Sequence, residues 1–213
     1  MNSGDESLGQ VPPRIDEAIQ EGAEAASVAL SKWLGRPASL VVSRVRFVEL
    51  IEATEALGPG DAVVAACAIP LSGPLPGTVL MIFDDRSAMT MIDALLGRPE
   101  GTGTEWGEME QSAAQETSNI VVCAFVNAMA ESLNPGGLMI PGPPEFRFEF
   151  SGSLIEFALM DQMSRNDQIM MVEIHFSVDG ITNDWAMVIV PAAGGLETLG
   201  LGDLGGEHPG EPS

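Results

Sequence analysis

The order of elements in this chain repeats at an offset of about 100 residues, and this repeat limits the possible folds more than any other feature. "DAVVAACAIPLSG…GTVLMIF" in the first half matches "DQIMMVEIHFSVDG…WAMVIV" in the second half in its pattern of apolar runs and turns. A helix candidate precedes each set of strands, at about 15–34 and at about 105–133. Either half alone would leave an exposed sheet edge. The repeat therefore predicts one pseudo-two-fold α+β domain, internally duplicated, with long helices packed on antiparallel strands.

Turn residues divide the remainder of the chain into further strands and one short helix. The predicted strands are 39–50, 61–71, 77–83, 145–152, 153–161, 167–178 and 185–190, and the predicted short helix is 86–97. We expect a disordered N-terminus at 1–12, a single domain at 13–192 with half-repeats of about 13–100 and 101–192, and a flexible Gly/Pro-rich acidic tail at 193–213.

The strong acidic excess restricts the partners of this chain. It carries 31 acidic against 9 basic residues, a net charge of −22. Nucleic acid and anionic membrane surfaces need clustered Lys and Arg, so neither is expected to bind. The first residues, "MNSGDES", lack the apolar core of a signal peptide, and no apolar run reaches the length of a membrane span. We therefore expect a cytoplasmic protein.

The few cysteines and histidines argue against several catalytic classes. Cys67 and Cys123 both lie in apolar segments, which is typical of free thiols in a reducing compartment. The only histidines are His175, in a strand pattern, and His208, in the tail. A His-based metal site or a Ser-His triad is therefore not expected, and we predict no metal and no cofactor bound by the chain itself.

The second long helix candidate carries a polar seam, which consists of Ser112, Glu116, Asn119, Cys123 and Asn127. Their spacings of four, three, four and four residues place them in one stripe on a helix. A solvated face would normally carry charges, yet this helix has none between Glu116 and Glu131. An Asn amide offers a donor and an acceptor that can orient a water, and a Glu one turn away can pair with a partner's cation. The seam therefore indicates a surface that docks a partner, although an ordinary solvated face remains an alternative.

Ser112, Glu116 and Asn119 match the signature of the CheC/CheX/FliY family of chemotaxis phosphatases, in which Asp or Ser is followed by Glu and then Asn at these spacings. Pro141 falls one position before the proline of that signature. The chain resembles this family over roughly 13–192, including "LSGPLPGTVLMIF" and "DALLGRP", and is closest to CheC-like members.

The resemblance implies removal of the aspartyl phosphate from a CheY-like receiver domain. Asn119 would orient the attacking water and Glu116 would contact the receiver's Lys, while Ser112, Thr117, Ser118 and Cys123 would lie at the docking surface. The receiver would supply Mg²⁺ and the phosphorylated Asp. Phosphoryl transfer needs positioning and charge stabilisation more than a new nucleophile, which agrees with the absence of a catalytic His.

Two departures from the family pattern stand out. Thr117 and Ser118 replace the usual Ile-Gly, which we expect to add side chains near the docking surface. Many CheC members carry a second motif in the first helix, where this chain has Glu17 and Gln20, 99 residues before Glu116 and Asn119. Pro13 stands at the position that matches Ser112, and Ser43 stands near the expected proline. A degenerate second site, or an ordinary amphipathic helix, agrees with these changes.

Two other functions remain open on sequence alone. The chain can be a non-enzymatic binding module, similar to the middle domain of FliM or to a CheC-type docking partner of the deamidase CheD. It can also be an unrelated α+β binding protein in which the motif is coincidental.

Overall fold

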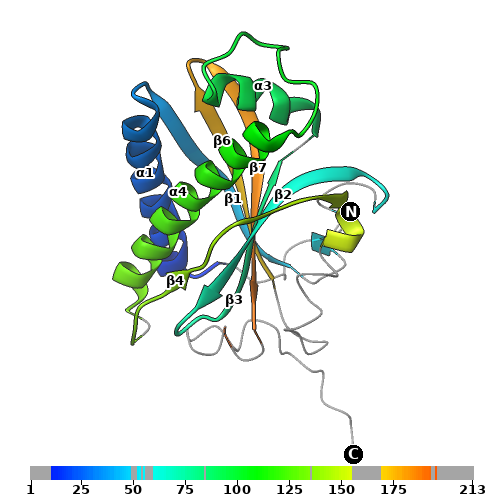
Figure 1. The fold of residues 1–213 in the computed structure, drawn as a ribbon. Coiled ribbons are helices and arrows are strands. Elements are labelled where there is room, and N and C mark those ends of the chain that lie inside the picture. The colour runs from blue at the N-terminus through cyan, green and yellow to red at the C-terminus, as the bar shows by residue number, and fades with distance from the viewer. Residues whose placement is uncertain are drawn as a thin grey trace, which may run out of the picture.

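A computed structural model describes residues 11–48, 52–53, 55, 60–83, 85–134, 136–154, 169–192 and 195. One antiparallel sheet forms the centre of the molecule, and two long helices, α1 (Pro13–Leu34) and α4 (Glu108–Leu133), lie side by side against it (Figure 1). A shorter helix, α3 (Asp85–Leu95), lies near one end of α4. The predicted α+β class, with long helices packed on antiparallel strands, is confirmed.

The sheet has seven strands, and every pair of neighbours is antiparallel. Six strands follow the order β1-β6-β7-β3-β2-β4, and β5 also pairs with β2. The strands are β1 (Ala38–Val48), β2 (Val63–Ser72), β3 (Gly77–Phe83), β4 (Ile140–Pro141), β5 (Glu145–Phe150), β6 (Ile169–Val178) and β7 (Ile181–Pro191).

The strand order is compatible with a duplicated chain. β3 of the first half pairs with β7 of the second half, from Gly77 opposite Pro191 to Phe83 opposite Trp185. On one side β1 of the first half pairs with β6 of the second, and on the other side β5 of the second half pairs with β2 of the first. Exchange of β1 with β5, β2 with β6 and β3 with β7 leaves this order unchanged, so each half covers a strand of the other.

Local sequence explains where the long helices begin and end. Pro13 occupies the first turn of α1, where a missing N–H costs nothing, and Gly35 ends the helix in the left-handed conformation with φ of 66°. In α4, Glu108 and Glu110 lie in the first turn, where the helix dipole favours negative charge. Asn134 ends α4 with φ of 44°, and its backbone N–H donates to the Ala130 carbonyl.

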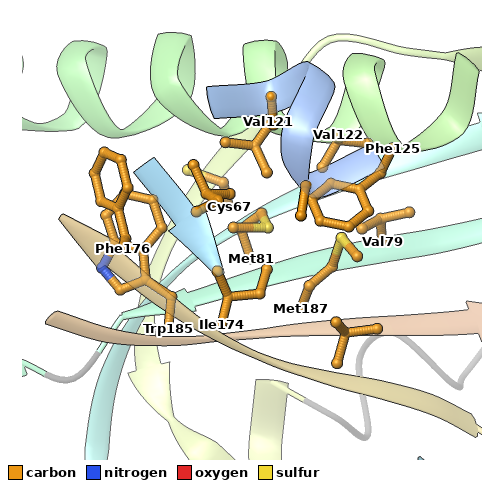
Figure 2. Close-up of a cluster of buried hydrophobic side chains, with 14 of the residues drawn as sticks. Cys67, Val79, Met81, Val121, Val122, Phe125, Ile174, Phe176, Trp185 and Met187 are labelled. Atoms are coloured by element: carbon orange, nitrogen blue, oxygen red, sulfur yellow. The ribbon is translucent and has the colours of Figure 1, made fainter. Parts of the chain in front are cut away.

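The core lies between the two long helices and the sheet. Figure 2 shows Val121, Val122 and Phe125 of α4 pointing toward strand residues that include Cys67 and Met81. At one end of this core the Trp185 ring lies 4.8 Å from Phe83 and 4.2 Å from Phe176, measured between ring centroids, so the cluster joins three strands. This buried apolar layer holds α4 rigidly against the sheet.

Hydrogen bonds attach α1 to the neighbouring strand β1. The Leu40 backbone N–H donates to the Ser27 hydroxyl at 2.7 Å, and the Ala38 backbone N–H donates to the Ser31 hydroxyl at 2.9 Å. These contacts satisfy N–H groups at the start of β1 and fix α1 beside it.

The sequence placed several boundaries differently from the structure. α4 begins at Glu108 rather than at 105, and β7 begins at Ile181 rather than at 185. The predicted strand 153–161 is wrong at its start, because 151–154 are helical, and the rest of that segment lies outside the described residues. Val11, predicted to be disordered, packs partly buried against the core. Residues 1–10 and nearly all of the predicted tail also lie outside the described part.

Candidate functional site

α4 has one face on the sheet and one face turned away from it. The buried residues of α4 include Val121, Val122, Phe125 and Met129, as the apolar pattern of the sequence predicted. The polar seam lies on the other face: Ser112, Glu116 and Asn127 are exposed, and Asn119 and Cys123 are half-buried. The structure therefore brings the five seam residues together on one accessible edge.

An open groove of about 700 Å³ runs between α4 and α1. α4 contributes Asn119, Cys123 and Asn127 among others to its lining, and α1 contributes Glu21, Ala25 and Ala29. Sequence reasoning predicted the seam but not this groove, because its second wall depends on how α1 packs. The Ser132 hydroxyl of α4 donates to the Glu21 carboxylate at 2.6 Å, which links the two walls.

Asn119 and Cys123 are directly connected. The Cys123 thiol donates to the Asn119 side-chain oxygen, with 3.7 Å between Sγ and Oδ1. Burial raises the pKa of the Cys123 thiol above its ordinary value, and the nearby negative charge of Glu116 raises that pKa further. Glu116, Asn119 and Cys123 therefore form one electrostatically linked group on consecutive turns of α4.

Thr117 and Ser118 do not belong to the docking surface, so their predicted role in partner binding is wrong. Both side chains are 0% exposed. The Thr117 hydroxyl donates to the Ala113 carbonyl one turn earlier, at 2.8 Å. Ser118 faces the Cys67 thiol of β2, whose pKa is raised to about 12 by burial. The side chains at these two positions therefore lie on the packed side of α4 and add nothing to the exposed seam.

A hydrogen bond links the turn of α4 that carries Glu116 to the segment before β5. The Gln115 side-chain amide donates to the Pro144 carbonyl at 2.9 Å. That carbonyl belongs to the segment that follows β4, where Pro141 pairs with Leu71 of β2. Pro141, one position before the proline of the signature, therefore lies in an edge strand and does not line the groove.

A buried carboxylate holds the start of α4 against α3. Asp93 of α3 is fully buried and accepts the backbone N–H groups of Thr102 and Gly103 at 2.8 and 2.9 Å. The Arg98 guanidinium lies 3.2 Å from Asp93 and 2.8 Å from Glu110 in the first turn of α4. The "DALLGRP" segment of the family resemblance therefore has a structural role.

The predicted second pair lies on α1. Glu17 and Gln20 are both exposed, one turn apart, but neither lines the groove. Pro13, in place of Ser112, forms the first turn of the helix. Ser43 lies at an irregularity of β1, where the register with β6 shifts, and its hydroxyl donates to the Glu173 carbonyl at 3.2 Å.

Within the described ranges no group of three or more His, Cys, Asp or Glu residues is placed to hold a metal ion. In the same part of the chain, each helix is too short or too polar to cross a membrane.

No protein-family profile matches the chain. It is 27% identical over 119 residues to a protein of Halobacterium salinarum provisionally named CheY-P phosphatase CheC1, an alignment that covers 56% of this chain. The aligned region spans only 60% of that relative's length.

Solved structures share the fold over most of the chain. FliY from Thermotoga maritima has a TM-score of 0.69 at 17% identity, with 90% of this chain and 96% of FliY covered. The FliM middle domain from Vibrio alginolyticus has a TM-score of 0.62 at 20% identity, with 87% and 96% covered. A complex of CheX with CheY, BeF₃ and Mg²⁺ from Borrelia burgdorferi contains a chain with a TM-score of 0.50 at 15% identity, with 82% and 97% covered.

The fold of this chain is the one shared by FliY, the FliM middle domain and CheX. In sequence the chain is similar to the CheC1 relative, and the spacing of Ser112, Glu116 and Asn119 resembles the signature of the CheC/CheX/FliY family.

Proposed function

We propose that this protein hydrolyses the aspartyl phosphate of a CheY-like receiver domain. The observation that carries the proposal is the position of Glu116 and Asn119, one turn apart on the accessible edge of a helix that the core holds in place. The name of the Halobacterium relative and the CheX–CheY complex support this reading.

The chemistry follows from what the two side chains offer. The Asn119 amide accepts a hydrogen bond from a water and holds the water oxygen in line with phosphorus. That oxygen forms the new P–O bond while the bond to the aspartyl oxygen breaks. The products are a free carboxylate and inorganic phosphate that keeps both hydrogens of the water. Positioning of this kind removes much of the entropic barrier without a covalent intermediate on the phosphatase.

Glu116 serves as an anchor for the receiver. Its exposed carboxylate pairs with the ammonium group of the receiver's active-site Lys, which brings Asn119 to the phosphoryl group. Mg²⁺ and the phosphorylated Asp belong to the receiver, so the phosphatase needs no cofactor of its own. The encounter takes place in the cytoplasm, where receiver domains work.

The test is the decay of a phosphorylated receiver from the same organism, followed with and without the protein. Asn119→Ala should lower the rate of dephosphorylation about a hundredfold, because the attacking water is no longer positioned. Glu116→Gln is expected to lower kcat/KM about tenfold, through loss of one charge-assisted hydrogen bond. Glu149→Gln, an equal charge change on the exposed strand β5, is the matched control. If wild-type protein accelerates the loss of phosphate from none of the receivers tested, the proposal is wrong.

A binding module without catalytic activity is the second candidate. The shared fold with FliM middle domains favours it. This reading predicts that Glu116 and Asn119 are dispensable, and that a pull-down recovers flagellar-switch components or CheD. A protein that accelerates receiver decay through Asn119 contradicts it.

A further inference from the structure

Cys123 lies one turn after Asn119 and contacts its side-chain amide. In the proposed function this amide orients the attacking water. The Sγ to Oδ1 distance of 3.7 Å is within the range for a sulfur hydrogen bond. Both residues are half-buried in the groove between α1 and α4, so the contact is partly protected from competing water. The position of the thiol is set by α4 itself, whose neighbouring residues Val122 and Phe125 are buried in the core.

The Cys123 thiol is suited to donate a hydrogen bond. A thiolate cannot donate a hydrogen bond, whereas a neutral thiol can. Burial and the charge of Glu116 both raise the pKa of Cys123, which keeps the proton on sulfur at neutral pH. The carboxylate that anchors the receiver thus also favours the donor form of the thiol.

An Asn amide has two nearly isosteric ends, and an unheld side chain can present either one. A donor at Oδ1 removes this ambiguity, because the opposite orientation would place the NH₂ group against the thiol proton. The Oδ1 atom still has a second lone pair for the water, and Nδ2 is directed away from Cys123.

We propose that Cys123 is a positioning residue, whose S–H···Oδ1 hydrogen bond fixes the Asn119 amide in the orientation that accepts the attacking water. The inference rests on the proposed phosphatase function and adds a residue that acts through Asn119 without touching the phosphoryl group.

The first helix supplies an internal contrast. Glu24 stands 99 residues before Cys123, as Gln20 stands 99 residues before Asn119. Glu24 is an exposed residue, and an ionised carboxylate accepts hydrogen bonds but cannot donate one. The corresponding amide on α1 therefore has no thiol to hold its oxygen, which agrees with a second site that is degenerate.

Vibrational spectroscopy tests the contact without reference to activity. The S–H stretching band that disappears in Cys123→Ala belongs to Cys123, which separates it from the band of Cys67. We expect this band to shift to higher frequency in Asn119→Ala, because the acceptor is lost. A band at the same frequency with and without the Asn119 amide would overturn the proposal.

Kinetic measurements test whether the contact between Cys123 and Asn119 affects catalysis. Cys123→Ala should lower kcat for receiver dephosphorylation about two- to fivefold with KM unchanged, as expected for one weak hydrogen bond. Cys123→Ser keeps a donor and should remain within about twofold of wild type. Cys67→Ala removes the other thiol, which lies below the same helix but faces Ser118, and should leave kcat unchanged.

The outcomes separate this inference from the proposed function. Loss of activity in Asn119→Ala with full activity in Cys123→Ala would leave the phosphatase function standing and rule out the positioning role. An equal loss in Cys67→Ala would mean that packing under α4 is responsible, and would also rule it out. Wild-type protein that is inactive on every receiver would overturn both.

Discussion

Gly22 of α1 lies directly against Phe125 of α4. A Cβ atom at Gly22 would stand 2.7 Å from Cδ1 and 2.9 Å from Cα of Phe125, closer than such atoms approach in proteins. The missing side chain lets the two helices approach until both rest on the sheet. The same approach brings Ala25 and Ala29 opposite the seam and forms the groove.

Gly22→Ala should destabilise the fold by about 1–3 kcal/mol, because the backbone of Phe125 cannot move without separating α4 from the core. At an unconstrained helix position the same change would stabilise by about 1 kcal/mol, so the sign of the effect is diagnostic. Urea unfolding measures it. Glu24→Ala, on the exposed face of α1, serves as the control and should change stability little. A stabilised Gly22→Ala variant would show that the helices are not in close contact here.

Ser118→Ala should leave receiver dephosphorylation unchanged and keep or raise stability by up to about 1 kcal/mol. The Ser118 hydroxyl is fully buried and makes no hydrogen bond of standard geometry, with the Cys67 thiol as a weak neighbour. Removal of a poorly satisfied buried hydroxyl relieves its desolvation cost. The rate of receiver dephosphorylation and the urea midpoint, measured on the same preparation, test this prediction. A raised KM for the receiver in Ser118→Ala would show that Ser118 contributes to receiver binding.

Helix geometry separates the parts of the site that the sequence could predict from those it could not. Successive residues turn by about 100°, so Asn119 returns to the side of Glu116 while Ser118 points nearly opposite. The seam and the buried positions of Val121 and Phe125 followed from this period. The expectation that Thr117 and Ser118 face a partner came from the family pattern and conflicted with the same geometry, which the structure bears out.

The features of the fold and the site that the sequence did not predict depend on tertiary packing. The close approach of α1 to α4 requires the contact between Gly22 and Phe125, which lie 103 positions apart and which no local pattern brings together. The repeat predicted helices and strands in order, but the pairing of β1 with β6 and of β5 with β2 places strands of opposite halves together. Such non-local pairing is set by the whole sheet. The contact between Cys123 and Asn119 was visible only as a spacing of four residues.

Glu110 makes stability depend on pH in a predictable direction. The hydrogen bond from Arg98 lowers the pKa of the Glu110 carboxyl from its ordinary value of 4.5, so folding favours the ionised form. The stabilisation is fully present above 4.5 and is lost as pH falls through the lowered pKa. Glu110→Gln should therefore be less stable than wild type at neutral pH, and the difference should shrink in acid.

Urea midpoints of wild type and variant, measured at neutral pH and well below 4.5, test this dependence. Glu108→Gln is the control, because Glu108 shares the first turn of α4 and its dipole but is exposed. A gap between wild type and Glu110→Gln that stays constant across the pH range would mean that Arg98 does not favour the charged carboxyl.

Gln20→Asn should restore part of the phosphatase activity when it is combined with Asn119→Ala. Glu17 and Gln20 are exposed one turn apart on α1, as Glu116 and Asn119 are spaced on α4, so the change shortens the amide arm to the length used at the main site. The recovery should be incomplete, because Glu24 replaces the thiol donor and a misplaced amide costs up to about a hundredfold in rate. Receiver decay catalysed by the double variant, compared with Asn119→Ala alone, measures the gain. Adding Glu17→Gln should lower the recovered kcat/KM about tenfold if the activity arises on α1, as expected for Glu116→Gln at the main site. A recovered activity that this third change leaves unaltered would show that it arises elsewhere.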